Sequence, residues 1–317
     1  MFDQFGDQLS IPIPPDEEGY TGRECPVCAS YFKITLGTGL KGIDHAICPY
    51  CGHKDDAGAF TTQEQVEYAQ SIAFRYAADQ IFKSLKRLEG RYPKQRSFIN
   101  LEVTVKPGSP IPIAHYTEKD LETKLVCENC TLSYAVYGVF AFCPDCGQHN
   151  SFQMLNSNFA VVEKMLNMAQ SVEADVREAL LESCLGKVVS VFDGYGRELC
   201  AVYAKKTTGP TKAVKVSFQN VTNARTHIQT HFGFDLASSL SQDEWQGIIR
   251  LFQKRHLLSH KAGEIDDEYI AKANDPFAIR GRKVTLRSEE ITMLLDQLKR
   301  VAAFIDQQMK TRFGDPT

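Results

Sequence analysis

Long hydrophobic runs are missing from this sequence. None of its apolar stretches approaches the roughly 20 residues that a helix needs to span a bilayer, and Met1 to Gly6 lack the basic segment and apolar core of a secretion signal. An excess of either charge is missing too, because 36 lysines and arginines face 39 acidic residues, for a formal net charge of −3. This balance excludes a protein that binds nucleic acid over its whole surface, so any RNA contact must use a local basic patch. We therefore expect a cytoplasmic protein with no membrane partner.

The composition is otherwise that of an ordinary globular protein. Hydrophobic residues make up 43% of the 317 residues and charged residues 24%, which is enough apolar material for a sizeable core. A chain of this length predicts two domains or slightly more.

Eight of the ten cysteines stand in C-x-x-C pairs, which form two quartets. The quartets are Cys25, Cys28, Cys48 and Cys51, and then Cys127, Cys130, Cys143 and Cys146. Two such pairs separated by a hairpin-length loop are typical of zinc ribbons, in which four thiolates hold Zn²⁺ tetrahedrally. A cytoplasmic location favours zinc over disulfides. We predict two structural zinc ions, and no catalysis at either metal because four thiolates leave no open coordination position.

The second pair of each quartet has the form Cys-Pro-x-Cys-Gly. Such a knuckle turns backbone N–H groups toward its first sulfur, and Gly52 and Gly147 are expected to close the turn with a positive φ. The other two cysteines, Cys184 and Cys200, lie in apolar segments with helical spacing. We expect both to be buried rather than redox-active.

The patterning divides the chain into five parts. They are a flexible tail rich in proline and acid (1–20), a first zinc ribbon (21–60), a linking helix (61–92), a second zinc ribbon (93–155) and a helical domain (156–317). The predicted fold class is α+β and multidomain, with two small β zinc ribbons and a linking helix followed by an all-α bundle.

Capping signals predict where several helices begin and end. Thr61 with Glu64, and Ser241 with Glu244, have the spacing of capping boxes, and Gly90 is expected to end the first helix.

Periodicity predicts the remaining elements. A helical pattern runs over 159–204, where Gly186 and the stretch 194–196 are candidates for breaks or kinks. Further helices are expected up to about Gly233 and from Ser288 onward. Strands are expected from Phe98 to Val105, at Leu125 and Val126, and over 134–142.

The last two turns of the helix after Ser241 carry Arg255, His256 and His260. Arginine can hold a phosphate through two parallel N–H bonds, and histidine can transfer a proton near neutral pH. The apolar row that begins at Trp245 continues into His256 and His260, so we expect a buried face that becomes polar at its end. Such a face is typical of a cleft or a subunit interface.

Three other interpretations of these residues stay open. Cations gather at helix C-termini because of the helix dipole, and residues 250–262 hold four cations and no acid. A histidine on a buried face is often only a hydrogen-bonded core residue. His256 and His260, four positions apart, could instead bind a metal, although no third ligand stands near them in the sequence.

The stretch from Leu251 to Gly263 resembles the signature region of HEPN domains (higher eukaryotes and prokaryotes nucleotide-binding). In that family an arginine, a polar residue, three variable residues and a histidine lie on one helix of an α-bundle. The resemblance covers roughly residues 159–312, with His256 and Lys261 at positions where the family commonly has asparagine. It implies a homodimer whose two motif helices meet and form one composite RNase site.

From this resemblance we predict a metal-independent endoribonuclease in which a ribose 2′-OH attacks the adjacent phosphate. His260 is expected to be the main general acid or base, Arg255 to stabilise the charge on the phosphorane, and His256 to assist. Such RNases resemble toxins and anti-phage or stress effectors, and the ribbons could recruit RNA, a regulatory partner or a ligand.

Two further functions stay open. One is a non-catalytic adaptor, with a HEPN-like bundle for dimerisation and ribbons for partner binding. The other is a zinc-ribbon regulator that binds nucleic acid, which is disfavoured because the ribbons show no concentrated run of lysine and arginine with interleaved aromatics.

Overall fold

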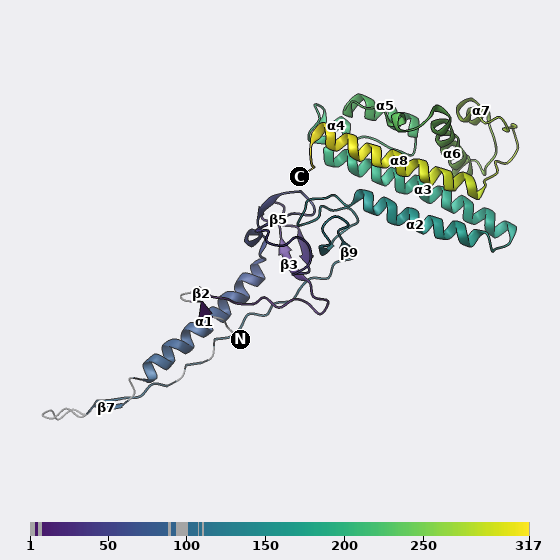
Figure 1. Cartoon of the computed structure of the whole chain (residues 1–317). Coiled ribbons are helices and arrows are strands. Elements are labelled where there is room, and N and C mark those ends of the chain that lie inside the picture. Colours follow the sequence, from purple (N-terminus) through teal and green to yellow (C-terminus); the bar gives the residue numbers. More distant parts are fainter. Residues whose placement is uncertain are drawn as a thin grey trace. The chain divides into compact units, whose positions relative to one another are not determined.

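The computed structural model describes residues 4–5, 8–87, 90–92, 101–106, 108–109 and 111–316 (Figure 1). The chain forms two compact units. The first contains residues 1–138 and 143–146, and the second contains 139–142 and 147–317. The fold is a mixed one, with small antiparallel sheets in the first unit and a helical region in the second.

A four-stranded antiparallel sheet is the centre of the first unit. Its strands, in spatial order, are β3 (Thr21–Glu24), β4 (Tyr31–Ile34), β10 (Ser133–Val136) and β9 (Thr123–Val126). Each outer hairpin encloses one C-x-x-C pair, so both quartets contribute to one sheet. The sequence predicted two separate zinc ribbons, at 21–60 and 93–155, and did not predict a shared sheet. Pairing β4 with β10 removes two exposed sheet edges, and both strands are buried along almost their whole length.

The remaining strands of the described residues form two-stranded hairpins. They are β1 (Gln4–Phe5) with β2 (Gln8–Leu9), β5 (His45–Ile47) with β6 (Lys54–Asp56), and β7 (Gly90–Tyr92) with β8 (Leu101–Val103). The β5–β6 hairpin holds Cys48 and Cys51 in its turn, and a 3₁₀ turn, η1 (Ala57–Phe60), follows it. Of the predicted strand residues, Phe98 lies outside the described part of the chain.

Helix α1 (Gln63–Lys86) occupies the predicted linking segment but begins one residue later than expected. Its capping box uses Thr62 and Gln65 instead of Thr61 and Glu64. The reason is tertiary, because Gln65 is fully buried and also donates to the Gly22 carbonyl oxygen at 2.9 Å. The last helical residue is Lys86, so the helix ends before Gly90.

The N-terminal segment, predicted to be a flexible tail, contains a hydrogen-bonded turn near its end. The Asp16 carboxylate accepts the backbone N–H of Tyr20 at 2.8 Å, and Lys33 donates to it at 2.8 Å. Lys33 lies on β4 and is buried, so this contact attaches the segment to the sheet. The pairing holds the pKa of Asp16 below its ordinary value, although burial alone would raise it.

The second unit is built from helices along its described length. They are α2 (Ser151–Ala169), α3 (Ala174–Ala204), α4 (Pro210–Ala213), α5 (Val221–Phe232), α6 (Gln242–His260), α7 (Asp267–Ala273) and α8 (Ser288–Phe313), with a 3₁₀ turn, η2 (Leu236–Ser239). Helix α3 packs against α2, α6 and α8, and one continuous apolar core joins them. The predicted starts at Ser241 and Ser288 are confirmed, and Gly233 ends α5 with φ 79°.

The predicted breaks at Gly186 and 194–196 are wrong, because α3 runs without interruption through both. The chain instead turns between α2 and α3, after Ala169. Gly196 has a packing role. A β-carbon at this position would lie 2.5 Å from ring carbons of Phe218, so only glycine lets that ring rest against the helix.

Candidate functional site

The two cysteine quartets are shaped to hold metal ions. The four sulfur atoms of each quartet lie within 4.8 Å of one another. The Sγ–Sγ distances include 3.8 Å for Cys25–Cys51 and 3.6 Å for Cys28–Cys48 in the first quartet. In the second they include 3.7 Å for Cys127–Cys146 and 3.4 Å for Cys130–Cys143. A tetrahedron of sulfurs at the Zn–S distance of about 2.3 Å has edges of about 3.8 Å. Both quartets therefore fit Zn²⁺ with four thiolates, and the predicted ligands are brought together as expected.

Backbone conformation supports both knuckles of each quartet. Gly52 and Gly147 have φ of 72° and 71°, which confirms the turn expected after Cys-Pro-x-Cys. The first knuckles make the same turn with Ala29 (φ 55°) and Thr131 (φ 64°), which the sequence did not reveal. A side chain in this region strains the backbone, and most of all a β-branched one.

Substituting Thr131→Gly is expected to stabilise the first unit by about 1 kcal/mol, because glycine adopts this left-handed conformation without the Cβ clash. Gly147→Ala, at the matched position of the second knuckle of the same quartet, is expected to be destabilising by a similar amount. Thermal unfolding of the zinc-loaded protein measures both. A change in melting temperature in the same direction for both substitutions would contradict this account.

The thiols of the quartets do not hold their protons equally. Hydrogen bonding from Cys143 lowers the pKa of Cys127 to about 5, against the opposing effect of burial. Burial raises the pKa of Cys28, but hydrogen bonds from Ser30 and its neighbouring thiols outweigh it and lower that pKa to about 7. Each quartet thus has one thiol that readily becomes a thiolate, the form that binds zinc.

The two quartets are also tied to each other within the first unit. The Ile47 N–H donates to the Pro144 carbonyl oxygen at 2.7 Å, which joins the second knuckles. The Tyr50 hydroxyl donates to the Tyr31 carbonyl oxygen at 2.8 Å and accepts the Tyr137 N–H at 2.9 Å. These short contacts therefore join the two quartets directly.

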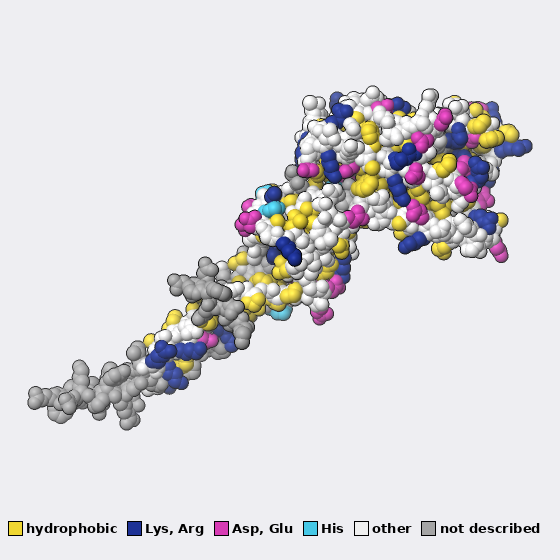
Figure 2. Space-filling view, in the orientation of Figure 1, with side chains coloured by type: hydrophobic (Ala, Val, Ile, Leu, Met, Phe, Trp, Pro, Cys, Tyr) yellow, Lys and Arg dark blue, Asp and Glu magenta, His cyan; other side chains and the backbone are white. Residues whose placement is uncertain are grey.

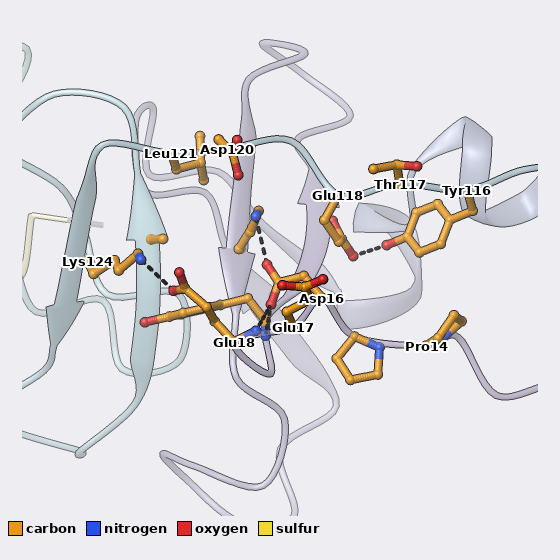
Figure 3. Close-up of a pocket in the computed structure, with 14 residues that line it drawn as sticks. Pro14, Asp16, Glu17, Glu18, Tyr116, Thr117, Glu118, Asp120, Leu121 and Lys124 are labelled. Atoms are coloured by element: carbon orange, nitrogen blue, oxygen red, sulfur yellow. Dashed lines mark hydrogen bonds and ion pairs between the residues drawn. The ribbon is translucent and has the colours of Figure 1, made fainter.

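A cavity of about 700 Å³ lies beside the sheet of the first unit (Figure 3). Glu118, on its wall, accepts the Gly22 N–H at 2.6 Å and is hydrogen-bonded by the hydroxyls of Tyr31 and Tyr116. Glu18 pairs with Lys124 across the same cavity. These carboxylates attach loops to the sheet, and the described residues that line the cavity include no histidine or cysteine. We assign it no chemistry.

The predicted catalytic residues lie at the end of α6. Arg255 is half-buried, and its Nη1 donates to Gln219 Oε1 at 3.5 Å. Its Nε is buried and has no hydrogen-bond partner in the described part of the protein. His256 is half-buried, and His260, the last residue of α6, is exposed. The guanidinium is therefore held at Nη1, and Nη2 remains as the donor for an anion because the enclosed Nε cannot reach one.

His256 and His260 lie side by side, with ring centroids 5.0 Å apart. Neither ring makes a hydrogen bond or ion pair within the described residues, whereas His149 is buried beside Glu198, and His227 bonds to the Ala213 carbonyl oxygen at 3.0 Å. The interpretation that these histidines are hydrogen-bonded core residues therefore does not apply to either of them. Both retain ring nitrogens that can exchange a proton with a ligand.

The four cations at the end of α6 have different surroundings. Lys254 is buried and lies 2.9 Å from Glu290 of α8, and Arg250 donates to the Asn274 carbonyl oxygen at 3.0 Å. Lys261 pairs with Asp266. Arg250 and Arg255 both lack an ion pair among the described residues, but Arg250 is held by the carbonyl oxygens of Ala273 and Asn274, whereas Arg255 has only the Gln219 side chain. The helix dipole alone does not distinguish these four residues, but their tertiary partners do.

The expected buried row through His256 and His260 is wrong in its last turns. The buried side of α6 continues from Phe252 through Lys254 to Leu257. Lys254 is accepted there because Glu290 and the Thr285 carbonyl oxygen satisfy its ammonium group. The histidines therefore lie along the border of the buried face instead of inside it.

Sequence reasoning missed the group that positions Arg255. Asp193 of α3 is buried and accepts the backbone N–H groups of Phe218 at 2.5 Å and Gln219 at 3.2 Å. This carboxylate holds the loop before α5, and the loop carries Gln219 to Arg255. The one sequence signal was a single aspartate inside the apolar run Val191-Phe192-Asp193.

A metal role for the histidine pair gains no support, because within the described residues only the two quartets bring three or more potential metal ligands together. No helix in the described part of the chain is long and apolar enough to cross a membrane. The chain matches no family model, no curated protein and no solved structure.

Proposed function

We propose that the protein is a metal-independent endoribonuclease of the HEPN type, with two structural zinc sites. The observation that carries the proposal is the end of α6, where Arg255 has no ion pair and two neighbouring histidines make no hydrogen bond within the described residues. RNA cleavage by its own 2′-OH needs a base, an acid and a group that stabilises the phosphorane, and these residue types supply all three.

In this mechanism His260 accepts or donates the transferred proton, since it is the more exposed histidine and lies at the helix end. Arg255 binds the non-bridging phosphate oxygens, and Gln219 orients its guanidinium. His256 binds the phosphate or acts as the complementary proton donor. The products are a 2′,3′-cyclic phosphate and a 5′-OH end. Such an activity suits a toxin or an anti-phage effector.

The proposed active form is a homodimer in which the two α6 ends meet. The exposed position of His260 in the single chain supports this arrangement, because a partner subunit can then complete a shared site. Incubating the purified protein with RNA in EDTA, with the structural zinc retained, is expected to give cleavage, and light scattering of the same sample is expected to give a dimer.

Analysis of the RNA ends identifies the mechanism. We expect 2′,3′-cyclic phosphate and 5′-OH ends, and we expect RNA with 2′-deoxyribose at the cut position to resist cleavage because it lacks the nucleophile. Equal cleavage of the deoxy-substituted RNA would contradict the proposal, as would a reaction that stops in EDTA while zinc is still bound.

A non-catalytic adaptor is the second candidate, and one observation favours it. Phe74, Ile81 and Leu85 of α1 are 64%, 60% and 46% exposed, and they lie on one side of the helix at spacings of seven and four. An exposed apolar row of this kind is typical of protein-binding surfaces. Retention of the protein's biological effect after His260→Ala would favour the adaptor over the enzyme.

A further inference from the structure

An exposed loop beside the end of α6 carries apolar and basic side chains together. The loop comprises residues 276–283 and follows α7; we refer to it as the Phe277 loop. Phe277 is 87% exposed, the most exposed of the large hydrophobic residues described, and Ile279 is 52% exposed. Figure 2 shows hydrophobic and basic side chains next to each other at the end of the helical unit where α7 and this loop lie. Exposing a phenylalanine to water is unfavourable, so a binding role deserves consideration.

The Phe277 loop is held in place by its backbone. The Phe277 N–H donates to Asp275 at 3.1 Å, and Asp275 in turn accepts the hydroxyl of buried Tyr269 at 2.7 Å. The Gly281 N–H donates to the Ile265 carbonyl oxygen, and the Ile265 N–H donates to the Arg282 carbonyl oxygen. The exposed side chains are thus presented from an ordered turn, which lowers the entropy lost on binding.

The same contacts connect the loop to the proposed catalytic residues. The Val284 N–H donates to the Gly263 carbonyl oxygen at 2.8 Å, and the Gly263 N–H donates to the Leu257 carbonyl oxygen at 3.0 Å. Gly263 follows His260 by three residues. The Phe277 loop is therefore attached directly to the turn that ends α6.

The charge of the loop is positive. Residues 276–283 contain three cations and no acid. Arg282 has no ion pair within the described residues, and Arg280 has one, to Asp267 at 3.2 Å, in which both side chains are more than 70% exposed. An exposed pair of this kind is weak, so both arginines are available to an anionic ligand.

We propose that the Phe277 loop is the substrate-binding platform for single-stranded RNA, on which a base stacks against Phe277 while Arg280 and Arg282 contact the flanking phosphates. Stacking on an exposed aromatic ring combined with backbone contacts from arginine is how single strands are bound without sequence preference. Attachment of the loop to the His260 turn would deliver the strand to the cleavage site. This inference deepens the proposed ribonuclease function and rests on it for the identity of the substrate.

The test measures RNA binding separately from cleavage. Fluorescence anisotropy with a labelled single-stranded RNA of about 12 nucleotides is carried out on the full chain carrying His260→Ala, so that the probe stays intact. In this background Phe277→Ala is expected to weaken binding about tenfold, the scale for losing one stacked base. Arg280→Ala with Arg282→Ala is expected to weaken it and to reduce the dependence of log affinity on log salt by about 1.4, or about 0.7 per lost phosphate contact.

Matched controls lie away from the loop. Phe74→Ala removes another exposed phenylalanine, and Lys212→Ala with Lys215→Ala removes two other exposed cations. Neither change is expected to alter binding. Because Phe277 is almost fully exposed, its replacement should leave the melting temperature unchanged, which separates a binding defect from misfolding.

The outcomes distinguish this inference from the proposed function. Unchanged RNA affinity in both loop variants overturns the platform, even if the native enzyme cleaves RNA. Loss of binding in the loop variants supports the platform, and a native chain that binds RNA but never cleaves it refutes the ribonuclease alone. If the loop variants instead lose binding to phosphatidylserine vesicles while RNA binding persists, the occupant is a membrane surface and the RNA platform is wrong.

Discussion

Replacing His260 with alanine is expected to lower the rate of RNA cleavage at least about a hundredfold, the usual scale for losing a general acid or base. The ring of His260 is exposed and makes no hydrogen bond within the described residues, so the substitution removes a proton-transfer group and, of the reported contacts, only the ring contact with His256. Arg255→Ala is expected to have a similar effect, because the charge on the phosphorane is then unbalanced. Single-turnover cleavage of a defined RNA measures both rates.

The chain offers close controls for these variants. His231 lies on α5 beside His227, with ring centroids 4.5 Å apart, in the same spacing as the proposed pair, and His231→Ala is expected to leave cleavage unchanged. Arg255→Lys is expected to remain inactive, because lysine lacks the planar fork that binds two phosphate oxygens. His256→Ala should cost less than His260→Ala if His256 only binds the phosphate. Equal activity of the native chain and His260→Ala would refute the assignment of His260.

Removal of zinc is expected to unfold the first unit. Each quartet should contribute several kcal/mol to folding, because the described sheet is small and its two outer hairpins turn at the quartets. Elemental analysis of the reduced protein is expected to give two zinc ions per chain. Cys143→Ser should reduce this number and destabilise both quartets, since the Ile47–Pro144 hydrogen bond joins their second knuckles.

Cys184→Ala is the matched control for the zinc experiment. This thiol is also buried, but it belongs to the core of the second unit and to neither quartet. The substitution should leave two zinc ions bound and reduce stability only through lost packing. Fewer than two zinc ions in intact, reduced native protein would contradict the assignment of two structural sites.

Features that depend on a few neighbouring residues could be predicted from the sequence. The positive φ of Gly52 and Gly147 follows from the sterics of a single knuckle, and the capping box of Ser241 and Glu244 is complete within one turn. Thr61 with Glu64, as predicted, and Thr62 with Gln65, as observed, both have the spacing of a capping box. Only the burial of Gln65 distinguishes them, and the local sequence does not encode it.

The effect of a glycine within a helix also depends on tertiary packing that the local sequence does not encode. Gly186 and Gly196 were expected to interrupt α3, since glycine weakens isolated helices. Packing of the buried α3 outweighs that cost, and at Gly196 the missing β-carbon is what lets Phe218 approach.

The sequence by itself determined the two zinc quartets, the order of small sheets followed by helices, and the presence of Arg255, His256 and His260 near one helix end. Only the tertiary structure decided that both quartets share one sheet and that a buried aspartate, Asp193, holds the loop that orients Arg255. The physical reason is the range of the contacts. Spacing and periodicity report which side of an element is apolar, but they do not report which distant residue will satisfy a buried charge or pair with a strand.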